Sequence, residues 1–229
     1  MKEIAIVTGG SSGLGFSIAK RLSESGIETA LIGRSLSRLQ ESRQKLNNTS
    51  MLIFNGNIAD EAFVSVAYKS IAASGYTVKY LFNCAATGKF GDADKNTKAD
   101  LDTVLEGSLI GLVLMSTLGL SSMSVEGGTI INVMSTAALK GNPSETLYCA
   151  AKWGARGYTE ALKAATKGTK VKVVGVYPGG MNTPFWSDNC GLKPDTSKFM
   201  NPHEVALQIV NAILPQNTLY VSDITIDRK

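Results

Sequence analysis

Short apolar runs rich in β-branched residues alternate along the chain with segments whose apolar residues recur at helical spacing. The runs predict strands at residues 3–8, 28–33, 51–55, 78–83, 128–134, 170–177 and 218–223, and the periodic segments predict helices at 13–25, 35–47, 60–74, 97–124, 146–167 and 202–214. Strands that are apolar at nearly every position are typical of a sheet covered on both faces. Strict alternation with short links therefore predicts an α/β fold, a doubly wound parallel sheet with helices on both faces.

The pattern predicts one domain spanning residues 1–229. The chain contains no internal repeat, low-complexity tract or linker, and its length suits one domain with a substantial core. The least regular segment is 183–201, which follows the sixth predicted strand and carries Pro184, Pro194 and three aromatic residues. Ligands of such sheets bind beyond the carboxyl ends of the strands. We therefore expect this segment to form a substrate lid, and an ordinary surface loop is the alternative.

Composition and charge narrow the function classes. Hydrophobic residues make up 44% of the chain and charged residues 18%, with a formal net charge of +4, which is typical of a globular domain. The lysines are scattered rather than gathered in a stripe, so a nucleic-acid partner is not expected. The apolar run at residues 4–7 is too short for a signal peptide or a membrane span, and 109–120 has the length of a buried helix. No membrane partner is expected either.

Three cysteines, Cys84, Cys149 and Cys190, bear on compartment and metal binding. Their number is odd and their spacing is not that of metal ligands, so neither a disulfide framework nor a metal site is predicted. Free thiols suit a reduced compartment, which makes the cytoplasm the expected location. The single histidine, His203, stands at a predicted helix start, where we expect a capping or surface role.

A glycine-rich stretch, VTGGSSGLG at residues 7–15, joins the first predicted strand to the first helix. Glycines there allow a tight turn and a close approach of the backbone to a ligand, and the helix N-terminus offers free N–H groups to a phosphate. A plain steric turn is the alternative, and the stretch has no Walker lysine. The setting predicts a dinucleotide site, formed by Gly9, Ser11, Ser12, Gly13, Leu14 and Gly15.

The end of the second predicted strand indicates which dinucleotide is bound. An acidic residue there accepts hydrogen bonds from the ribose and favours NAD, but this chain has Gly33, Arg34 and Ser35. A guanidinium makes bidentate, charge-assisted contacts to a phosphate, so Arg34 favours NADP(H), with NAD(H) as the other possibility. Arg38, one turn later, either assists or lies on the surface. A solvated helix residue is likewise the alternative for Arg34.

Tyr148 and Lys152 stand four residues apart in the stretch TLYCAAKWG, residues 146–154. On a helix this spacing places both side chains on one face. The spacing alone does not distinguish a catalytic pair from two amphipathic neighbours, because a motif this short also arises by chance.

Five ordered motifs supply the missing context. They are the TGxxxGxG stretch at 8–15, Asn57 with Ile58 after the third strand, Asn83–Cys84–Ala85–Ala86 after the fourth, Ser135 placed 13 residues before Tyr148, and YPGGMNT at 177–183. With these motifs the chain resembles the short-chain dehydrogenase/reductase family, in its single-domain branch. The resemblance covers residues 3 to about 223 and implies a Rossmann-type sheet of about seven strands in the order 3-2-1-4-5-6-7.

The resemblance also implies roles for individual residues. Tyr148 is the acid/base, Lys152 binds the nicotinamide ribose and lowers the phenol pKa together with the oxidised cofactor, and Ser135 holds the substrate oxygen. The implied cofactor contacts are Asn57 and Ile58 at the adenine, Asn83, Ala85 and Ala86 over the adenosine, and Pro178, Gly179, Met181 and Thr183 at the nicotinamide. The implied reaction is reduction of a small-molecule carbonyl compound to an alcohol, or the reverse, by an NADP-dependent oxidoreductase.

One departure from the family pattern matters for catalysis. Many relatives carry an asparagine in the helix after the fourth strand, where it completes a catalytic tetrad by anchoring a water chain to the lysine. Our alignment places Ser108 at that position, with Gly111 matching the motif's glycine. A serine hydroxyl also binds water or a helix carbonyl but reaches less far. Ser108 is therefore either a catalytic residue or a small helix-packing residue.

Other functions and assemblies remain open at this level. A non-catalytic dinucleotide-binding sensor or scaffold on the same fold is the main alternative, but a sensor does not require Ser135, Tyr148 and Lys152 together. An epimerase would need a larger C-terminal substrate domain than this chain holds. Phe185, Trp186 and Phe199 favour an apolar or ring-shaped carbonyl substrate. By resemblance we expect a homodimer or homotetramer formed through the helices 97–124 and 146–167.

Overall fold

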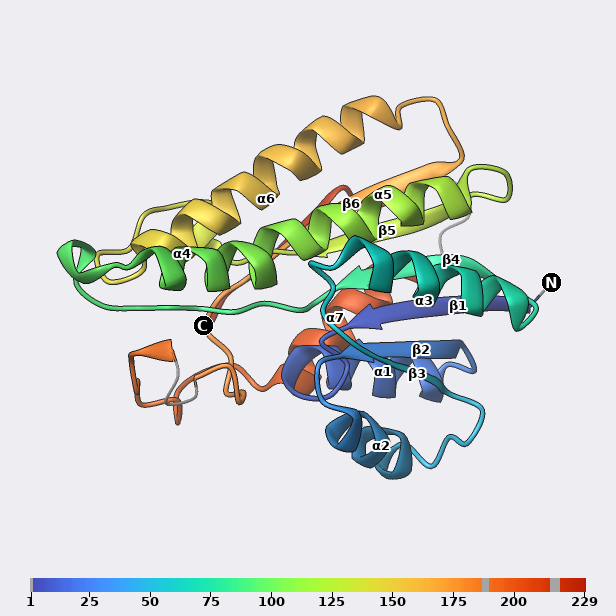
Figure 1. Ribbon diagram of the computed structural model, residues 1–229, viewed down its shortest axis with the longest axis horizontal. Helices are drawn as coiled ribbons and strands as arrows, with labels where there is room; N and C mark the ends of the chain where they lie inside the picture. The colour runs from blue at the N-terminus through green and yellow to red at the C-terminus, as the bar shows by residue number, and fades with distance from the viewer. Residues whose placement is uncertain (1, 187–189, 215–218) are drawn as a thin grey trace.

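A seven-stranded parallel sheet forms the centre of the computed structural model, which describes residues 2–186, 190–214 and 219–229 (Figure 1). The strands are β1 (Lys2–Thr8), β2 (Glu28–Gly33), β3 (Leu52–Asn55), β4 (Tyr76–Asn83), β5 (Gly128–Val133), β6 (Val171–Pro178) and β7 (Asp223–Ile226). Their order in the sheet is β3-β2-β1-β4-β5-β6-β7, and every neighbouring pair is parallel. The predicted fold class and strand order are confirmed.

Helices cover both faces of the sheet (Figure 1). One face carries α1 (Gly13–Glu24), α2 (Leu36–Lys45) and α7 (Pro202–Ile213), and the other carries α3 (Glu61–Ala73), α5 (Gly111–Met123) and α6 (Thr146–Ala165). A further helix, α4 (Lys98–Leu105), leads into α5, and short 3-10 turns lie at Ala93–Lys95 and Thr136–Ala138.

Alternation of side chains along the strands produces two separate cores. In β1, Ile4 and Ile6 pack toward α3, α5 and α6, whereas Ala5 and Val7 pack toward α1 and α7. All four side chains are at most 1% exposed. Burial on both faces explains why β1 is apolar at consecutive positions, and it leaves the strand's carboxyl end as the part of β1 that reaches a ligand.

The predicted helix 97–124 is interrupted by a π-helical turn at Glu106–Ile110, between α4 and α5. The run Lys98–Met123 is long and apolar enough to cross a membrane by length and composition only, a test that core helices also pass, and 39% of its most apolar window is buried inside the protein. Its buried face, including Met115 and Met123, packs on the sheet. The apolar pattern did not predict this interruption, because a π turn inserts only one extra residue into the helix.

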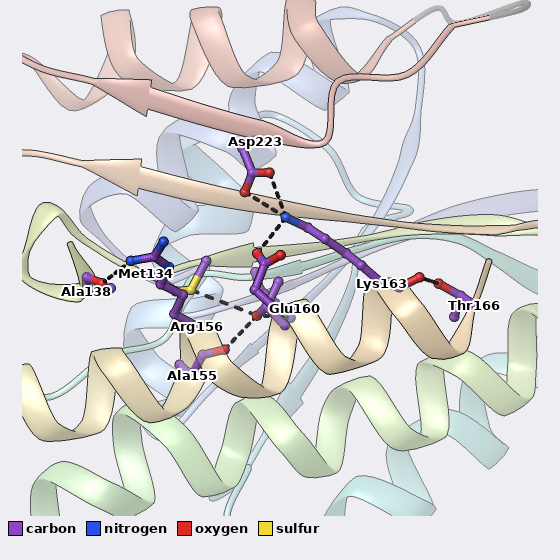
Figure 2. Close-up of polar contacts among 10 residues, drawn as sticks. Met134, Ala138, Ala155, Arg156, Glu160, Lys163, Thr166 and Asp223 are labelled. Carbon is purple, nitrogen blue, oxygen red and sulfur yellow. Dashed lines mark hydrogen bonds and ion pairs between the residues drawn. The ribbon is translucent and has the colours of Figure 1, made fainter.

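The last strand lies later in the chain than predicted. The prediction was 218–223, of which residue 218 lies outside the described residues, whereas β7 begins at Asp223 and pairs with β6 from Gly175 to Pro178. Leu219 is 83% exposed, so the apolar run that suggested a strand lies on the surface instead. The first residue of β7 forms an ion pair with α6: the Lys163 ammonium lies 2.7 Å from Asp223 and 2.8 Å from Glu160 (Figure 2).

Candidate active site

A cleft of about 890 Å³ runs along the carboxyl ends of the strands. Nearly all of the predicted site residues line it: Gly9, Ser11, Ser12, Gly13, Leu14, Gly15, Arg34, Ser35, Asn57, Ile58, Ala85, Ala86, Ser135, Tyr148, Lys152, Pro178, Gly179, Met181 and Thr183. The structure places the other two, Asn83 and Ser108, behind this lining, where both are buried. The volume suits a dinucleotide together with a small substrate.

The glycine loop brings backbone close to backbone. Gly9 has φ +66°, a left-handed conformation that favours glycine, and a Cβ there would lie 3.0 Å from the Cα of Ala85. A Cβ on Gly15 would lie only 2.4 Å from the carbonyl oxygen of Gly9. In the described part of the chain, the Ser12 side chain makes no capping bond to the first turn of α1. The N–H groups of that turn are therefore available to an anion.

The hydroxyl of Thr8 joins the ends of β1 and β4. It accepts hydrogen bonds from the backbone N–H groups of Cys84 (3.0 Å) and Ala85 (3.1 Å). Thr8 is fully buried, so these two bonds fix the spacing between the glycine loop and the segment after β4. The threonine of the TGxxxGxG motif thus shapes the cleft without lining it.

Two arginines, Arg34 and Arg38, lie at the end of the cleft next to β2. Arg34 follows β2, and Ser35 caps α2 by accepting a hydrogen bond from the N–H of Arg38 (3.4 Å). Both guanidinium groups are exposed and line the cleft. Over the described ranges, neither arginine forms an ion pair with a carboxylate. Their charge is therefore available to a phosphate group.

The residues predicted at the adenine lie in the same region. Asn57 closes a turn by accepting a hydrogen bond from the N–H of Ala59 (3.1 Å), and Ile58 is packed beneath Gly111 of α5. Asn83 lies deeper. Its amide donates to Ser116 (3.0 Å) and to Asn132 (2.9 Å), so it holds β4 against β5 and α5 in the interior.

Ser135, Tyr148 and Lys152 meet at the inner end of the cleft. Ser135 follows β5 and caps the 3-10 turn, accepting a hydrogen bond from the N–H of Ala137 (3.1 Å). Tyr148 and Lys152 lie one turn apart at the start of α6, with the Lys152 Nζ 5.5 Å from the centre of the Tyr148 ring. The residues that sequence spacing suggested are therefore brought together in space.

Burial governs the protonation of the tyrosine. It raises the pKa of Tyr148 well above that of a free phenol, and hydrogen bonding to Ser135 lowers it by a smaller amount. The lowered pKa that we expected from Lys152 together with an oxidised cofactor stays a prediction. The positive charge of an oxidised nicotinamide belongs to the bound cofactor, and without it desolvation dominates. A raised pKa keeps the phenol protonated at neutral pH.

Lys152 is a buried cation, with 1% of its surface exposed. Its ammonium donates to the carbonyl oxygen of Val133 (3.2 Å), and burial lowers its pKa to about 8. Cys84, at the second position of the strand-four motif, lies close enough to interact with this charge, although burial raises the thiol pKa to about 12. An ammonium has three donor hydrogens, so Lys152 retains the capacity to bind hydroxyl groups in the cleft.

Ser108 lies in the π-helical turn, 1% exposed. Its hydroxyl donates to the carbonyl oxygen of Thr87 (2.8 Å) and accepts from the N–H of the same residue (2.9 Å). A hydroxyl has one hydrogen to donate, and here that hydrogen is directed to Thr87. The geometry favours the packing and positioning reading of Ser108 over a direct relay of protons.

Sequence reasoning missed Phe90, which completes an aromatic cluster with Phe185 and Trp186 around Tyr148. The Phe90 ring lies 5.4 Å from the Tyr148 ring and 5.3 Å from the Trp186 ring, and Phe185 lies 5.6 Å from Tyr148. Phe90 stands in an irregular loop after β4, where no periodicity marks it. The nearby Gly88, where a Cβ would lie 2.6 Å from the Phe90 ring, was the signal available in the sequence.

Three features of the cleft match the parts of a nicotinamide dinucleotide. The glycine loop and the α1 N-terminus form a cradle that side chains would fill, the arginines supply unpaired positive charge, and the Lys152 ammonium lies at the inner end. Across the described residues no group of three or more His, Cys, Asp or Glu side chains is arranged to hold a metal ion. The three cysteines are free thiols.

Comparison with known proteins agrees with this architecture. The family model for short chain dehydrogenase matches residues 3–190. The chain is 28% identical over 213 residues to carbonyl reductase family member 4 of Danio rerio, covering 90% of this chain and 89% of that protein. It matches the crystal structure of a short-chain dehydrogenase/reductase from Vibrio parahaemolyticus with a TM-score of 0.86 and 30% identity, covering 99% and 100% of the two chains.

A serine dehydrogenase solved with NADP⁺ matches with a TM-score of 0.89 and 25% identity, covering 97% of this chain and 94% of the other. The fold and cleft are those of a Rossmann-type oxidoreductase. The chain belongs to the short-chain dehydrogenase/reductase family.

Proposed function

We propose that this protein is an NADP(H)-dependent carbonyl reductase that converts a small carbonyl compound to an alcohol, or the reverse, with Tyr148 as the acid/base. The observation that carries the proposal is the convergence of Ser135, Tyr148 and Lys152 at one end of a cleft whose other end presents Arg34 and Arg38. A sensor or scaffold would need the arginine end of the cleft but not the buried lysine beneath the tyrosine.

The chain's own residues have distinct tasks in this reaction. When held in the cleft, NADPH would supply a hydride to the carbonyl carbon. Tyr148 donates its phenolic proton to the carbonyl oxygen, and its raised pKa keeps that proton in place until negative charge develops there. The Ser135 hydroxyl accepts from Ala137 and hydrogen-bonds the Tyr148 phenol, and with substrate bound its hydrogen would be directed to the same carbonyl oxygen. Lys152, fixed by Val133, holds positive charge below the phenol and stabilises the phenolate that remains.

The arginines carry the preference for NADP(H). Arg34 and Arg38 lie one turn apart on the cleft wall and, among the residues described, have no acidic partner. A 2′-phosphate would supply that partner, whereas the ribose hydroxyl of NAD would leave both charges solvated. The neighbour solved with NADP⁺ supports this choice.

The substrate end favours apolar compounds that carry a ring. Phe90, Phe185 and Trp186 surround the phenol of Tyr148, so the space beside the acid/base is lined by aromatic faces and edges. Such walls bind planar apolar groups through offset and edge-to-face contacts. The similarity to a carbonyl reductase of Danio rerio supports a carbonyl substrate.

The deciding experiment is a panel of carbonyl substrates assayed with NADPH and NADH side by side. We expect aryl and cyclic ketones or aldehydes to be reduced faster than short aliphatic ones, and NADPH to be used better than NADH. Equal or higher rates with NADH would contradict the argument from Arg34. Tight NADPH binding without turnover of any carbonyl compound would favour the sensor.

We further propose a cytoplasmic homodimer or homotetramer. Outward-facing apolar side chains on the π turn and α6, such as Ile110 (41% exposed) and Trp153 (47% exposed), support self-association through this helical layer. The free thiols suit a reduced compartment. Sedimentation of the wild type and of Trp153→Glu tests the assembly, and a monomeric wild type would contradict it.

A further inference from the structure

The segment that follows β7 runs along the substrate end of the cleft. Ile226, the last residue of β7, pairs with Pro178 of β6, and its carbonyl oxygen accepts a hydrogen bond from the N–H of Gly179 (2.9 Å). The next two residues, Asp227 and Arg228, line the cleft. Figure 1 shows this end of the chain beside the loop between β6 and α7. The guanidinium of Arg228 therefore lies near residues 178–183, the segment expected to contact the nicotinamide and called here the nicotinamide-binding turn.

Arg228 makes two contacts with that loop. Its Nη1 donates a hydrogen bond to the carbonyl oxygen of Lys198 (3.3 Å), and its guanidinium carbon lies 5.3 Å from the centre of the Phe199 ring. A planar guanidinium both stacks on an aromatic face and donates at its edge, which an ammonium does less well. The two contacts together define the position of the Phe199 ring relative to β7.

Phe199 in turn is joined to the nicotinamide-binding turn. Its ring lies against Gly180, where a Cβ would come within 3.1 Å of it. The next residue, Met200, donates to the carbonyl oxygen of Gly180 (3.0 Å) and accepts from the N–H of Asn182 (2.9 Å). A shift of Phe199 would therefore displace residues 180–182.

Aromatic contacts continue from Phe199 to the acid/base. The Phe199 ring meets Trp186 edge to face at 5.5 Å, Trp186 meets Phe185 at 5.2 Å, and Phe185 meets Tyr148 at 5.6 Å. The indole of Trp186 is itself fixed by donating to the carbonyl oxygen of Met181 (3.1 Å). An unbroken series of ring contacts therefore joins Arg228 to the phenol.

We propose that Arg228 is a positioning residue for the reductase reaction. By holding Phe199, it fixes the aromatic wall beside Tyr148 and so sets the affinity of the enzyme for apolar carbonyl substrates. This inference rests on the proposed function. Arg228 acts through Phe199 and Trp186, and its guanidinium is directed at the loop rather than at the phenol or the reacting carbonyl.

The anchoring of β7 makes an exposed arginine effective in this role. A surface contact on a mobile segment contributes little, because the ordering entropy opposes it. Here β7 is paired with β6 along its length, and its first residue, Asp223, is held by Lys163 of α6 (Figure 2). Arg228 therefore follows a fixed strand by only two residues.

The test compares Arg228→Ala with Lys229→Ala, which removes the same charge from the adjacent residue. For an aryl ketone we expect Arg228→Ala to raise KM roughly three- to tenfold, the range for loss of one cation–π contact and one charged hydrogen bond at an exposed site. The kcat and the KM for NADPH should stay within about twofold. Arg228→Lys should restore the KM only in part.

A double-mutant cycle with Phe199→Leu tests the route of the effect. If Arg228 acts through Phe199, the double variant should be no worse than the more affected single variant. Additive effects would overturn the proposal, as would an equal KM rise in Lys229→Ala. A rise in the KM for NADPH with no change for the ketone would also overturn it, because it would assign Arg228 to the cofactor phosphates.

A measurement without turnover separates this inference from the proposed function. In a Trp153→Phe background Trp186 is the remaining tryptophan, and acrylamide quenching reports how well its ring is covered. We expect Arg228→Ala to increase quenching and Lys229→Ala to leave it unchanged. Unchanged quenching in both variants would refute the positioning role even if no carbonyl substrate were found.

Discussion

The Ser108 hydroxyl satisfies both backbone groups of Thr87, donating to its carbonyl oxygen at 2.8 Å and accepting from its N–H at 2.9 Å. Thr87 belongs to the loop that leads from β4 toward Phe90, and Ser108 belongs to the π turn between α4 and α5. The side chain that our alignment matches to the tetrad asparagine therefore joins the loop after β4, which lines the cleft, to the helical layer.

Replacing Ser108 by alanine should destabilise the protein by about 1–3 kcal/mol, because two partly buried backbone groups of Thr87 lose their partner. Denaturant unfolding measures the change, with Ser121→Ala on the exposed side of α5 as the control, expected within about 0.5 kcal/mol of wild type. The variant should retain catalysis at a reduced rate. Unchanged stability with abolished turnover would instead assign Ser108 to a proton relay.

Tyr148→Phe should lower kcat for carbonyl reduction by at least about a hundredfold, since it removes the proton donor. The ring contacts with Phe90 and Phe185 do not involve the hydroxyl, so the fold and the NADPH dissociation constant should be preserved. Steady-state kinetics and fluorescence titration with NADPH measure the two effects. Turnover at the wild-type rate in this variant would eliminate the proposed mechanism.

Lys152→Met should stabilise the protein at pH 7 while abolishing activity. Burial lowers the lysine pKa from 10.5 to about 8, so in this window the unfolded chain binds more protons than the folded one. Wild-type stability should therefore rise with pH between about 8 and 10.5, as the unfavourable buried charge is lost.

The methionine variant lacks this titration. Its advantage, about 1–3 kcal/mol at pH 7, should shrink as pH rises toward 10. Urea unfolding of both proteins at pH 7 and 9.5 measures the difference, and the pairwise comparison cancels ionisation of the tyrosines. A difference independent of pH would show that Lys152 is not held in an unfavourable charged state.

Arg34→Glu should reduce kcat/KM for NADPH by roughly 10- to 100-fold, because a charge-assisted contact is replaced by repulsion. The value for NADH should be maintained or increased, since a carboxylate accepts hydrogen bonds from ribose hydroxyls. Arg43→Glu makes the same charge change in the last turn of α2 and serves as the control. Equal losses in both variants would point to long-range charge rather than a phosphate contact.

Gly15→Ala should destabilise the protein by about 1–3 kcal/mol and weaken NADPH binding. The new Cβ would lie 2.4 Å from the carbonyl oxygen of Gly9, so the loop must shift although alanine is the better helix former. Gly141→Ala, with no atom within 4 Å of the new Cβ, is the matched control. Thermal unfolding with and without NADPH measures both effects.

The sequence pattern predicted those strands and helices whose apolar residues follow a regular spacing. Strands buried on both faces, such as β1 and β2, were found at nearly the predicted bounds because their apolar runs have a single structural explanation. The edge strand β7 was misplaced, because apolar and polar residues alternate along its four positions and none of the four is fully buried. The exposed run at Leu219 carried a stronger apolar signal.

Motif spacing predicted the residues that meet in the cleft, but not the contacts that hold them. Ser135 and Tyr148 come from different elements at a spacing that the resemblance supplied. Phe90 and Arg228 come from segments without periodicity, and their roles depend on partners more than 25 residues away in sequence. The direction of the Tyr148 pKa shift could not be predicted, because it depends on how completely those partners exclude water.

Asn83 and Asn132 face each other in the β4–β5 ladder, and their amides are hydrogen bonded at 2.9 Å, with Asn132 continuing to Thr159 on α6 at 3.0 Å. Sliding β4 by one residue would place an apolar or thiol side chain opposite Asn132 and strand its amide in the interior. Folding intermediates with misaligned strands are thereby disfavoured against the native one. The accuracy with which Ser135 and Lys152 come together is thus secured during folding by an amide pair that never meets a substrate.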